Sequence, residues 1–204
     1  MYHPHRLKPA TGVILIDFEG NQLLGEKELN DLRFSKLKEL IFEHPIKDMV
    51  ILSEDFQESG THTRMMELKD EVKDRYCWLE LPDKWADYDK DNPLNSITWI
   101  KKEAKKAGWE IKNVILAGQN LSGCVWKTLD YSALRWAEQG HNVQIVLSMC
   151  GDYEIAGVGP EKYMKSFALL YQKIKKSGQW AMIDIISDIK EIKYMDNGEL
   201  KCGE

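Results

Sequence analysis

VILAGQNLSGCV, residues Val114–Val125, is the stretch around which the rest of the chain is arranged. Its apolar start ends at Gly118, and this pattern predicts a buried strand. The polar and glycine residues that follow are typical of a tight turn. Cys124 then begins a run with helical spacing of apolar residues, so we expect a helix from Cys124 to Gln139 that Gly140 ends.

The place of Cys124 at the start of a helix favours chemistry at its sulfur. A thiol in the first helical turn feels the positive end of the helix dipole, which stabilises the thiolate. The thiolate is the nucleophilic form of cysteine. The stretch therefore offers a candidate nucleophile, and its partners have to come from other parts of the chain.

Strands and helices are predicted to alternate along the whole sequence. The predicted strands are Gly12–Asp17, Met49–Ser53, Arg75–Leu81, Val114–Ala117, Val143–Leu147 and Ala181–Ile186. The predicted helices are Ser35–His44, Arg64–Asp74, Ser96–Ala107, Cys124–Gln139 and one that starts at Pro160. This alternation is typical of a parallel sheet between helices. We expect an α/β fold, a three-layer, doubly wound, mainly parallel six-stranded sheet of order 3-2-1-4-5-6 with helices on both faces.

Two candidate groups meet at one edge of that sheet. Ligands of doubly wound sheets bind beyond the carboxyl ends of the strands, where the strand order reverses. Asp17 ends the first predicted strand and Cys124 follows the fourth, and these strands are neighbours in the expected order. A carboxylate beside a thiol can accept its proton. Lys84 and Lys90 both follow the third strand, and either can complete a charged trio. Backbone N–H groups of the turn Gly118–Gly123 can stabilise an oxyanion.

Four stretches of the chain resemble the isochorismatase-like family of cysteine hydrolases, which includes nicotinamidases. They are GVILIDFEGN (Gly12–Asn21), VILAGQNLSGCV, TWIKKEAKKAGWEIKNVILAG (Thr98–Gly118) and AMIDIISDIKEI (Ala181–Ile192). The second has the apolar run, the glycine, and the Cys-Val pair six positions after it that are usual in the family. The resemblance covers most of the chain in the family's order.

The resemblance implies roles for individual residues. It makes Cys124 the nucleophile and Asp17 the base that takes the thiol proton and returns it to the leaving amine. It leaves the third catalytic residue open between Lys84 and Lys90. It also implies a cis peptide at Gln119–Asn120, which turns the N–H of the second residue toward the oxyanion. The implied reaction is hydrolysis of a C–N bond of a small amide through a thioester.

The surroundings of this predicted site carry further expectations. Trp85, Tyr88 and Trp126 are candidate pocket walls for a flat substrate, with ordinary packing as the other interpretation. Asp55 and His62 lie in the region of the metal cluster of nicotinamidases, but with different spacing, so no metal is predicted. No other cofactor is predicted either.

An alternative interpretation is a non-catalytic binding or assembly module on the same fold. Glu19 stands where the family commonly has glutamine, and the aromatic segment Tyr163–Ile174 is a candidate subunit interface. We expect a homo-oligomer in either case. A nucleotide-binding Rossmann domain ranks last, because no G-x-G-x-x-G follows the first strand.

Composition sets the class of the protein. The 204 residues are 43% hydrophobic and 30% charged, which suits one domain over residues 1–204, and we expect residues 1–10 to be flexible. The net charge of −5 argues against nucleic-acid binding. No apolar run is long enough to span a membrane, and the N-terminus lacks a signal core, so we expect a cytoplasmic protein with a small-molecule substrate. The four cysteines form no C-x-x-C pair, which argues against zinc.

Overall fold

A parallel sheet of six strands forms the centre of the molecule. A computed structural model describes residues 7–16, 18, 27–54, 63–81, 96–119, 121–128, 131–151, 172, 175–176 and 182–202. The strands are β1 (Lys8–Ile16), β2 (Met49–Glu54), β3 (Cys77–Leu81), β4 (Trp109–Gly118), β5 (Asn142–Cys150) and β6 (Ile183–Ile186). Their order is β3-β2-β1-β4-β5-β6, and every pairing is parallel. The predicted fold class and strand order are confirmed.

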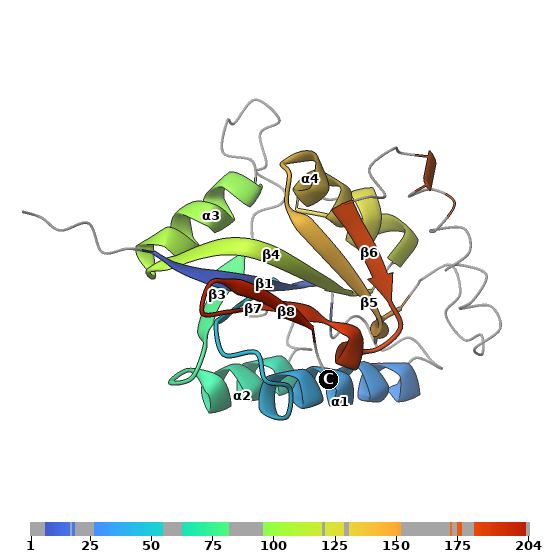
Figure 1. Cartoon of the computed structure of the whole chain (residues 1–204). Coiled ribbons are helices and arrows are strands. Elements are labelled where there is room, and N and C mark those ends of the chain that lie inside the picture. Colours follow the sequence, from blue (N-terminus) through green and yellow to red (C-terminus); the bar gives the residue numbers. More distant parts are fainter. Residues whose placement is uncertain are drawn as a thin grey trace, which may run out of the picture.

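Helices cover both faces of this sheet (Figure 1). The helices are α1 (Lys27–Phe42), α2 (Thr63–Val72), α3 (Ser96–Lys106) and α4 (Ala133–Glu138), together with a π-helix η1 (Leu121–Thr128) and a 3₁₀ turn η4 (Ile189–Glu191). α1 and α2 lie on one face, and α3 and α4 on the other. Strand order therefore reverses between β1 and β4, where the two halves of the sheet meet.

The sequence of β1 shows why these strands lie in the middle. Every residue from Ala10 to Ile16 is buried. A strand of a parallel sheet with helices on both faces is buried on both sides, so it reads as a continuous apolar run. The last six residues of β4, Asn113 to Gly118, are buried in the same way. The carboxyl ends of β1 and β4 are thus held firmly side by side.

Two predicted helices differ from the structure. The helix expected at Cys124–Gln139 is wrong as one element, because the chain forms η1 and then, from N-cap Ser132, the short helix α4. The predicted start at Cys124 is wrong too, because η1 begins at Leu121 and Cys124 is its fourth residue. The backbone at Ser132 is extended (φ −68°, ψ 167°), and this non-helical residue, which makes no side-chain capping hydrogen bond, precedes α4. α1 begins at Lys27, eight residues before the predicted start at Ser35. The helix expected from Pro160 lies outside the described residues.

A C-terminal hairpin was not predicted from the sequence. It consists of β7 (Lys193–Asp196) and β8 (Glu199–Cys202), which pair antiparallel. Asn197 and Gly198 join them with φ angles of 51° and 86°. An Asn-Gly pair with both φ angles positive makes the tight turn that hairpins prefer, so this pair was an available sequence signal.

Buried polar side chains attach the hairpin to the central sheet. The side-chain amide of Gln144 accepts a hydrogen bond from Lys193 N (2.7 Å) and donates one to Lys193 O (2.7 Å). The Nδ2 of Asn113 also donates to Lys193 O (2.6 Å). Thr11 Oγ1 accepts from Met195 N (2.8 Å). The hairpin is thus held by hydrogen bonds from buried side chains. Removing one partner of such a bond leaves a buried polar group unsatisfied, which lowers stability.

Replacing Gln144 with leucine should lower the free energy of unfolding by about 2 kcal/mol, because it removes both hydrogen bonds of a 2% exposed side chain to the backbone of Lys193. Urea unfolding at pH 7 measures the change. Lys193→Met is the control, since it removes an exposed ion pair with Asp184 and keeps the backbone bonds. A Gln144→Leu protein as stable as this control would contradict the assignment.

His141 makes stability depend on pH. Burial, followed by the charges of Lys101 and Lys112, lowers the pKa of His141 from 6.5 to about 4. The unfolded chain therefore binds more protons between pH 6.5 and 4, so the stability present above pH 6.5 is lost as the pH falls toward 4. We expect His141→Gln to remove about 1 to 2 kcal/mol of the acid-induced loss, after allowance for solvent screening. Urea unfolding of both proteins at pH 7 and 4.5 tests this, and an unchanged difference would contradict it.

None of the helices in the described residues is both long and apolar enough to cross a membrane.

Candidate active site

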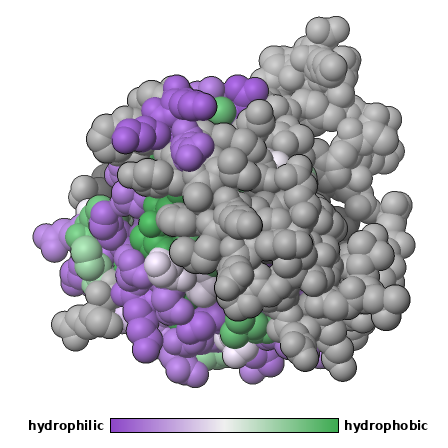
Figure 2. Space-filling model, turned by 90° about the vertical axis from the view of Figure 1, so that its right-hand side faces the viewer, coloured by the Kyte–Doolittle hydropathy of each residue, from purple (hydrophilic) through white to green (hydrophobic). Residues whose placement is uncertain are grey.

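The carboxyl ends of β1, β4 and β5 form the edge at which the site was predicted. Ile16 at the end of β1 pairs with Gly118 at the end of β4, and Gly118 in turn pairs with Cys150 at the end of β5. Figure 2 views the molecule from this side and shows a mostly hydrophilic described surface with small apolar patches. The strand order reverses at this edge, where α/β sheets bind their ligands.

The turn after β4 is tied to both neighbouring strands. The N–H of Gln119 donates to Ile16 O of β1 (2.9 Å). The N–H of Gly151, just after β5, donates to Gly118 O (2.9 Å), and the N–H of Leu121 donates back to Gly151 O (2.7 Å). These backbone bonds fix the path of the chain from the end of β4 to the start of η1.

Gly118 allows the end of β4 to lie close to the end of β1. Its φ of +141° is a conformation that residues with a side chain rarely adopt. A Cβ on Gly118 would lie 1.8 Å from the backbone oxygen of Ile16. The glycine at the end of the apolar run is therefore required by both the backbone angle and the packing of β4 against β1.

Cys124 lies on η1, six residues beyond the end of β4. Its side chain is half-buried and packs against the hydrophobic core. Residues of π-helices often belong to functional sites. The next two residues, Val125 and Trp126, are buried, at 0% and 2% exposure, and anchor η1 in the core. Cys124 thus lies on an element that buried neighbours anchor in the core, after the strand end where the strand order reverses.

The structure describes only part of the predicted site. Cys124, Gln119 and Trp126 lie in it; Trp126 belongs to the hydrophobic core, and its role as a pocket wall stays a prediction. The other predicted site residues lie outside the described residues: Asp17, Lys84, Lys90, Asn120, Trp85 and Tyr88. Asp55 and His62 lie outside them too. The predicted cis peptide Gln119–Asn120 involves Asn120, so it too lies outside the described residues and stays a prediction.

Arg33 of α1 is a residue at this edge that the sequence did not single out. Its side chain is only 3% exposed. Nη2 donates to Oε1 of Gln119 (3.0 Å) and also to Oδ1 of Asn30, one turn earlier on α1. A Cβ on Gly151 would lie 2.1 Å from Nη1 of Arg33. A buried guanidinium therefore lies directly against the turn that leads to Cys124.

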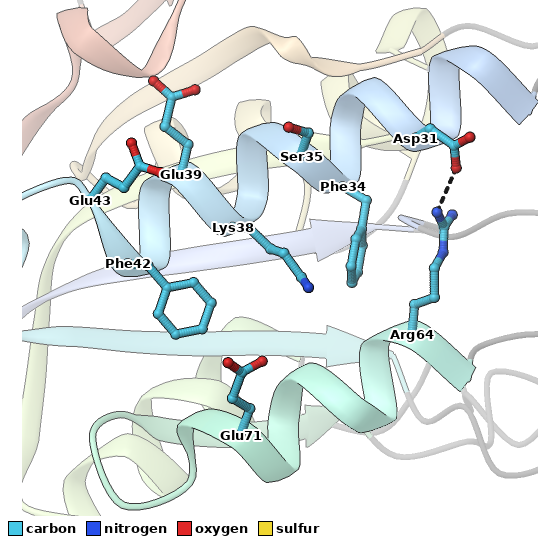
Figure 3. A pocket seen from close by; sticks show the side chains of 9 residues that line it. All are labelled: Asp31, Phe34, Ser35, Lys38, Glu39, Phe42, Glu43, Arg64 and Glu71. Atoms are coloured by element: carbon cyan, nitrogen blue, oxygen red, sulfur yellow. Dashed lines mark hydrogen bonds and ion pairs between the residues drawn. The ribbon is translucent and has the colours of Figure 1, made fainter.

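A separate groove opens between α1 and α2 (Figure 3). Phe34 lies in it, with Lys38 Nζ 5.4 Å and the guanidinium of Arg64 4.8 Å from its ring. Arg64 also forms an ion pair with Asp31 (2.7 Å). The residues that line this groove come from the two helices and from Glu43 just after α1, and they include no residue of the turn or of η1, so the groove is distinct from the edge that carries Cys124.

Within the described residues, no group of three or more histidine, cysteine, aspartate or glutamate side chains is arranged to hold a metal ion. The four cysteines all lie in this described part and form no disulfide. Burial raises the pKa of Cys77 on β3, which disfavours its thiolate.

No protein-family model and no curated protein sequence matches the chain. Two solved structures are similar to it. A nicotinamidase from Staphylococcus aureus has a TM-score of 0.46 and 10% sequence identity, over 85% of this chain and 98% of that one. An N-carbamoylsarcosine amidase from Thermoplasma acidophilum has a TM-score of 0.41 and 12% identity, over 89% of this chain and 96% of that one. Both similarities are distant.

Proposed function

We propose that this protein is a cysteine hydrolase that cleaves the C–N bond of a small amide, with Cys124 as its nucleophile. The observation that supports this most is the placement of Cys124. It follows β4 through a turn tied to β1 and β5, at the edge where the strand order reverses. A nucleophile on an anchored element at the kind of edge where α/β sheets bind ligands suits covalent catalysis.

The proposed reaction has two stages. Asp17 takes the thiol proton of Cys124, and the sulfur attacks the amide carbonyl carbon to form a C–S bond. The C–N bond then breaks, and Asp17 gives the proton to the leaving amine, which leaves a thioester on Cys124. Water, deprotonated by Asp17, attacks the thioester carbon. The C–S bond breaks, the acid is released, and the proton returns to the thiolate of Cys124.

The remaining predicted residues have supporting roles in this proposal. Lys84 or Lys90 stabilises the thiolate or orients Asp17 by its positive charge. The N–H groups of Asn120 and Cys124 donate to the oxyanion, the term that usually lowers the barrier of acyl transfer most. The nucleophile follows Asn120 closely in the chain, so one turn can supply both the thiol and the oxyanion donors.

Ammonia release from a panel of small primary amides, aromatic and aliphatic, tests the proposed activity. We expect turnover of at least one amide and its loss after treatment with iodoacetamide, with the carboxamidomethyl group found on Cys124 by peptide mapping. A folded protein that hydrolyses none of the panel, and whose Cys124 reacts no faster than an exposed cysteine, would contradict the proposal. That result would favour the binding or assembly module instead.

A further inference from the structure

We propose that Arg33 is a positioning residue for the reaction of Cys124. Its guanidinium holds the side chain of Gln119 and so fixes, from helix α1, the turn that leads to the nucleophile. This inference rests on the proposed function of Cys124. It assigns a role to a charged side chain that the proposed chemical steps do not use.

The burial of Arg33 is the first observation behind the proposal. A charged side chain that is 3% exposed has lost most of its hydration, which is unfavourable unless hydrogen bonds replace it. The guanidinium is rigid and planar and carries several N–H donors. Its Nη2 donates to both Gln119 Oε1 and Asn30 Oδ1. Asn30 lies on the same helix, so it orients Arg33 toward Gln119.

The space that Gly151 leaves is the second observation. A Cβ at this position would lie 2.1 Å from Nη1 of Arg33, so the guanidinium occupies the space that a side chain after β5 would need. Gly151 is also the residue whose N–H and C=O bond to Gly118 and Leu121. The guanidinium therefore bonds to the side chain of Gln119 and lies beside Gly151, the backbone partner of the turn.

The third observation is the number of elements that meet in the turn. Backbone bonds tie it to Ile16 of β1 and to Gly151 after β5. The bond from Arg33 adds α1, a helix that packs against the opposite face of the sheet from α3 and α4. A displacement of about 1 Å at a reacting group can reduce a rate by about 100-fold, so the fixing of this turn bears directly on catalysis.

Four variants test this role. Arg33→Met removes the charge and the donors, and Arg33→Lys keeps the charge but loses the fork. Gln119→Leu removes the acceptor on the turn. The control Arg135→Met removes an arginine whose ion pair with Glu138 (2.8 Å) lies on the solvent-exposed side of α4. Each variant is assayed for kcat and KM on the amide that the wild type hydrolyses, and for the rate of alkylation of Cys124 at pH 7.

We expect Arg33→Met and Gln119→Leu each to lower kcat and the alkylation rate at least 10-fold, with KM within about threefold of the wild type. Arg33→Lys should lie between them and the wild type, and Arg135→Met should match the wild type. The double variant Arg33→Met/Gln119→Leu should be no slower than either single one, since both act through one contact. Folded Arg33→Met with wild-type kcat, or losses that multiply in the double variant, would overturn the inference.

Gly151→Ala keeps the test decisive if Arg33→Met does not fold. Its methyl group displaces the guanidinium without removing the charge, and we expect a lowered kcat; wild-type kcat in the folded variant would overturn the inference. The wild type alone decides the proposed function. If it hydrolyses no amide, the ratio of alkylation rates between variants and wild type still decides whether Arg33 positions Cys124.

Discussion

Replacement of Cys124 with alanine should lower kcat/KM for amide hydrolysis at least about 1,000-fold, because the proposed mechanism has no other nucleophile. Cys124→Ser should be similarly inactive, since a serine hydroxyl ionises far less readily than a thiol at neutral pH. Ammonia release under steady-state conditions measures both. The thioester intermediate should also disappear from the mass spectrum of the quenched Cys124→Ala protein.

Cys202→Ser is the matched control for the removal of a thiol. Cys202 is exposed on β8, in the hairpin that bonds to Thr11, Asn113 and Gln144 and not to the carboxyl ends of the strands. Its replacement should leave kcat/KM unchanged. Activity of Cys124→Ala within threefold of the wild type would exclude Cys124 as the nucleophile, whatever its reactivity toward alkylating agents.

The second large effect is expected at Gly118. Gly118→Ala should lower the free energy of unfolding by at least about 3 kcal/mol, because the new Cβ meets the backbone oxygen of Ile16 at 1.8 Å and the φ of +141° is strained for alanine. The new Cβ on β4 collides with the backbone of Ile16 in β1, which cannot move without breaking the sheet pairing. Urea unfolding gives the stability, and iodoacetamide labelling reports the effect on Cys124.

Gly140→Ala separates strain from collision. Gly140 has a φ of +80° and no heavy atom within 4 Å of the added Cβ. It therefore carries only the conformational cost, about 1 kcal/mol. We expect Cys124 to be alkylated at the wild-type rate in Gly140→Ala and more slowly in Gly118→Ala. Equal stability losses in the two variants would contradict the prediction, because they would mean that the turn after β4 accommodates a Cβ at Gly118 without a collision.

The fold was predictable where burial dictates the sequence. Strands buried on both faces must be continuous apolar runs, so β1, β2, β4 and β5 were found from such runs, with ends within a few residues of the observed ones. The hairpin β7–β8 was missed because its strands are only four residues long and β8 is exposed, so it carries no apolar pattern. Its Asn197-Gly198 turn was the signal that remained.

The break between η1 and α4 was harder to foresee. The apolar residues after Cys124 keep a helical spacing through Trp136, which suggests one helix. In the structure, Val125 and Trp126 of η1 and Trp136 of α4 are all buried, so both pieces satisfy the same pattern. Spacing of apolar residues cannot separate a π-helix followed by a short α-helix from one continuous helix.

Of the described residues at the candidate site, the sequence singled out Cys124 and Gln119 but not Arg33. A cation in a helix usually faces water, and nothing local distinguishes Arg33 from its exposed neighbours. The available signal is its position in the helical repeat. Arg33 lies three residues after Asn30 and four before Leu37, and so on the buried face of α1. A charged residue in phase with the apolar side of a helix requires a buried partner, and that partner comes from a turn 86 residues away in the chain.

The rate of iodoacetamide alkylation of Cys124 as a function of pH tests the central claim most directly. Peptide mapping reads all four cysteines in one experiment, and Cys202, which is exposed, is the internal reference. Cys124 should react faster than Cys202 at pH 6.5, with a midpoint below the value of about 8.5 of an unperturbed thiol. A Cys124 that reacts no faster than Cys202 from pH 6 to 8 would contradict an activated nucleophile at this edge of the sheet.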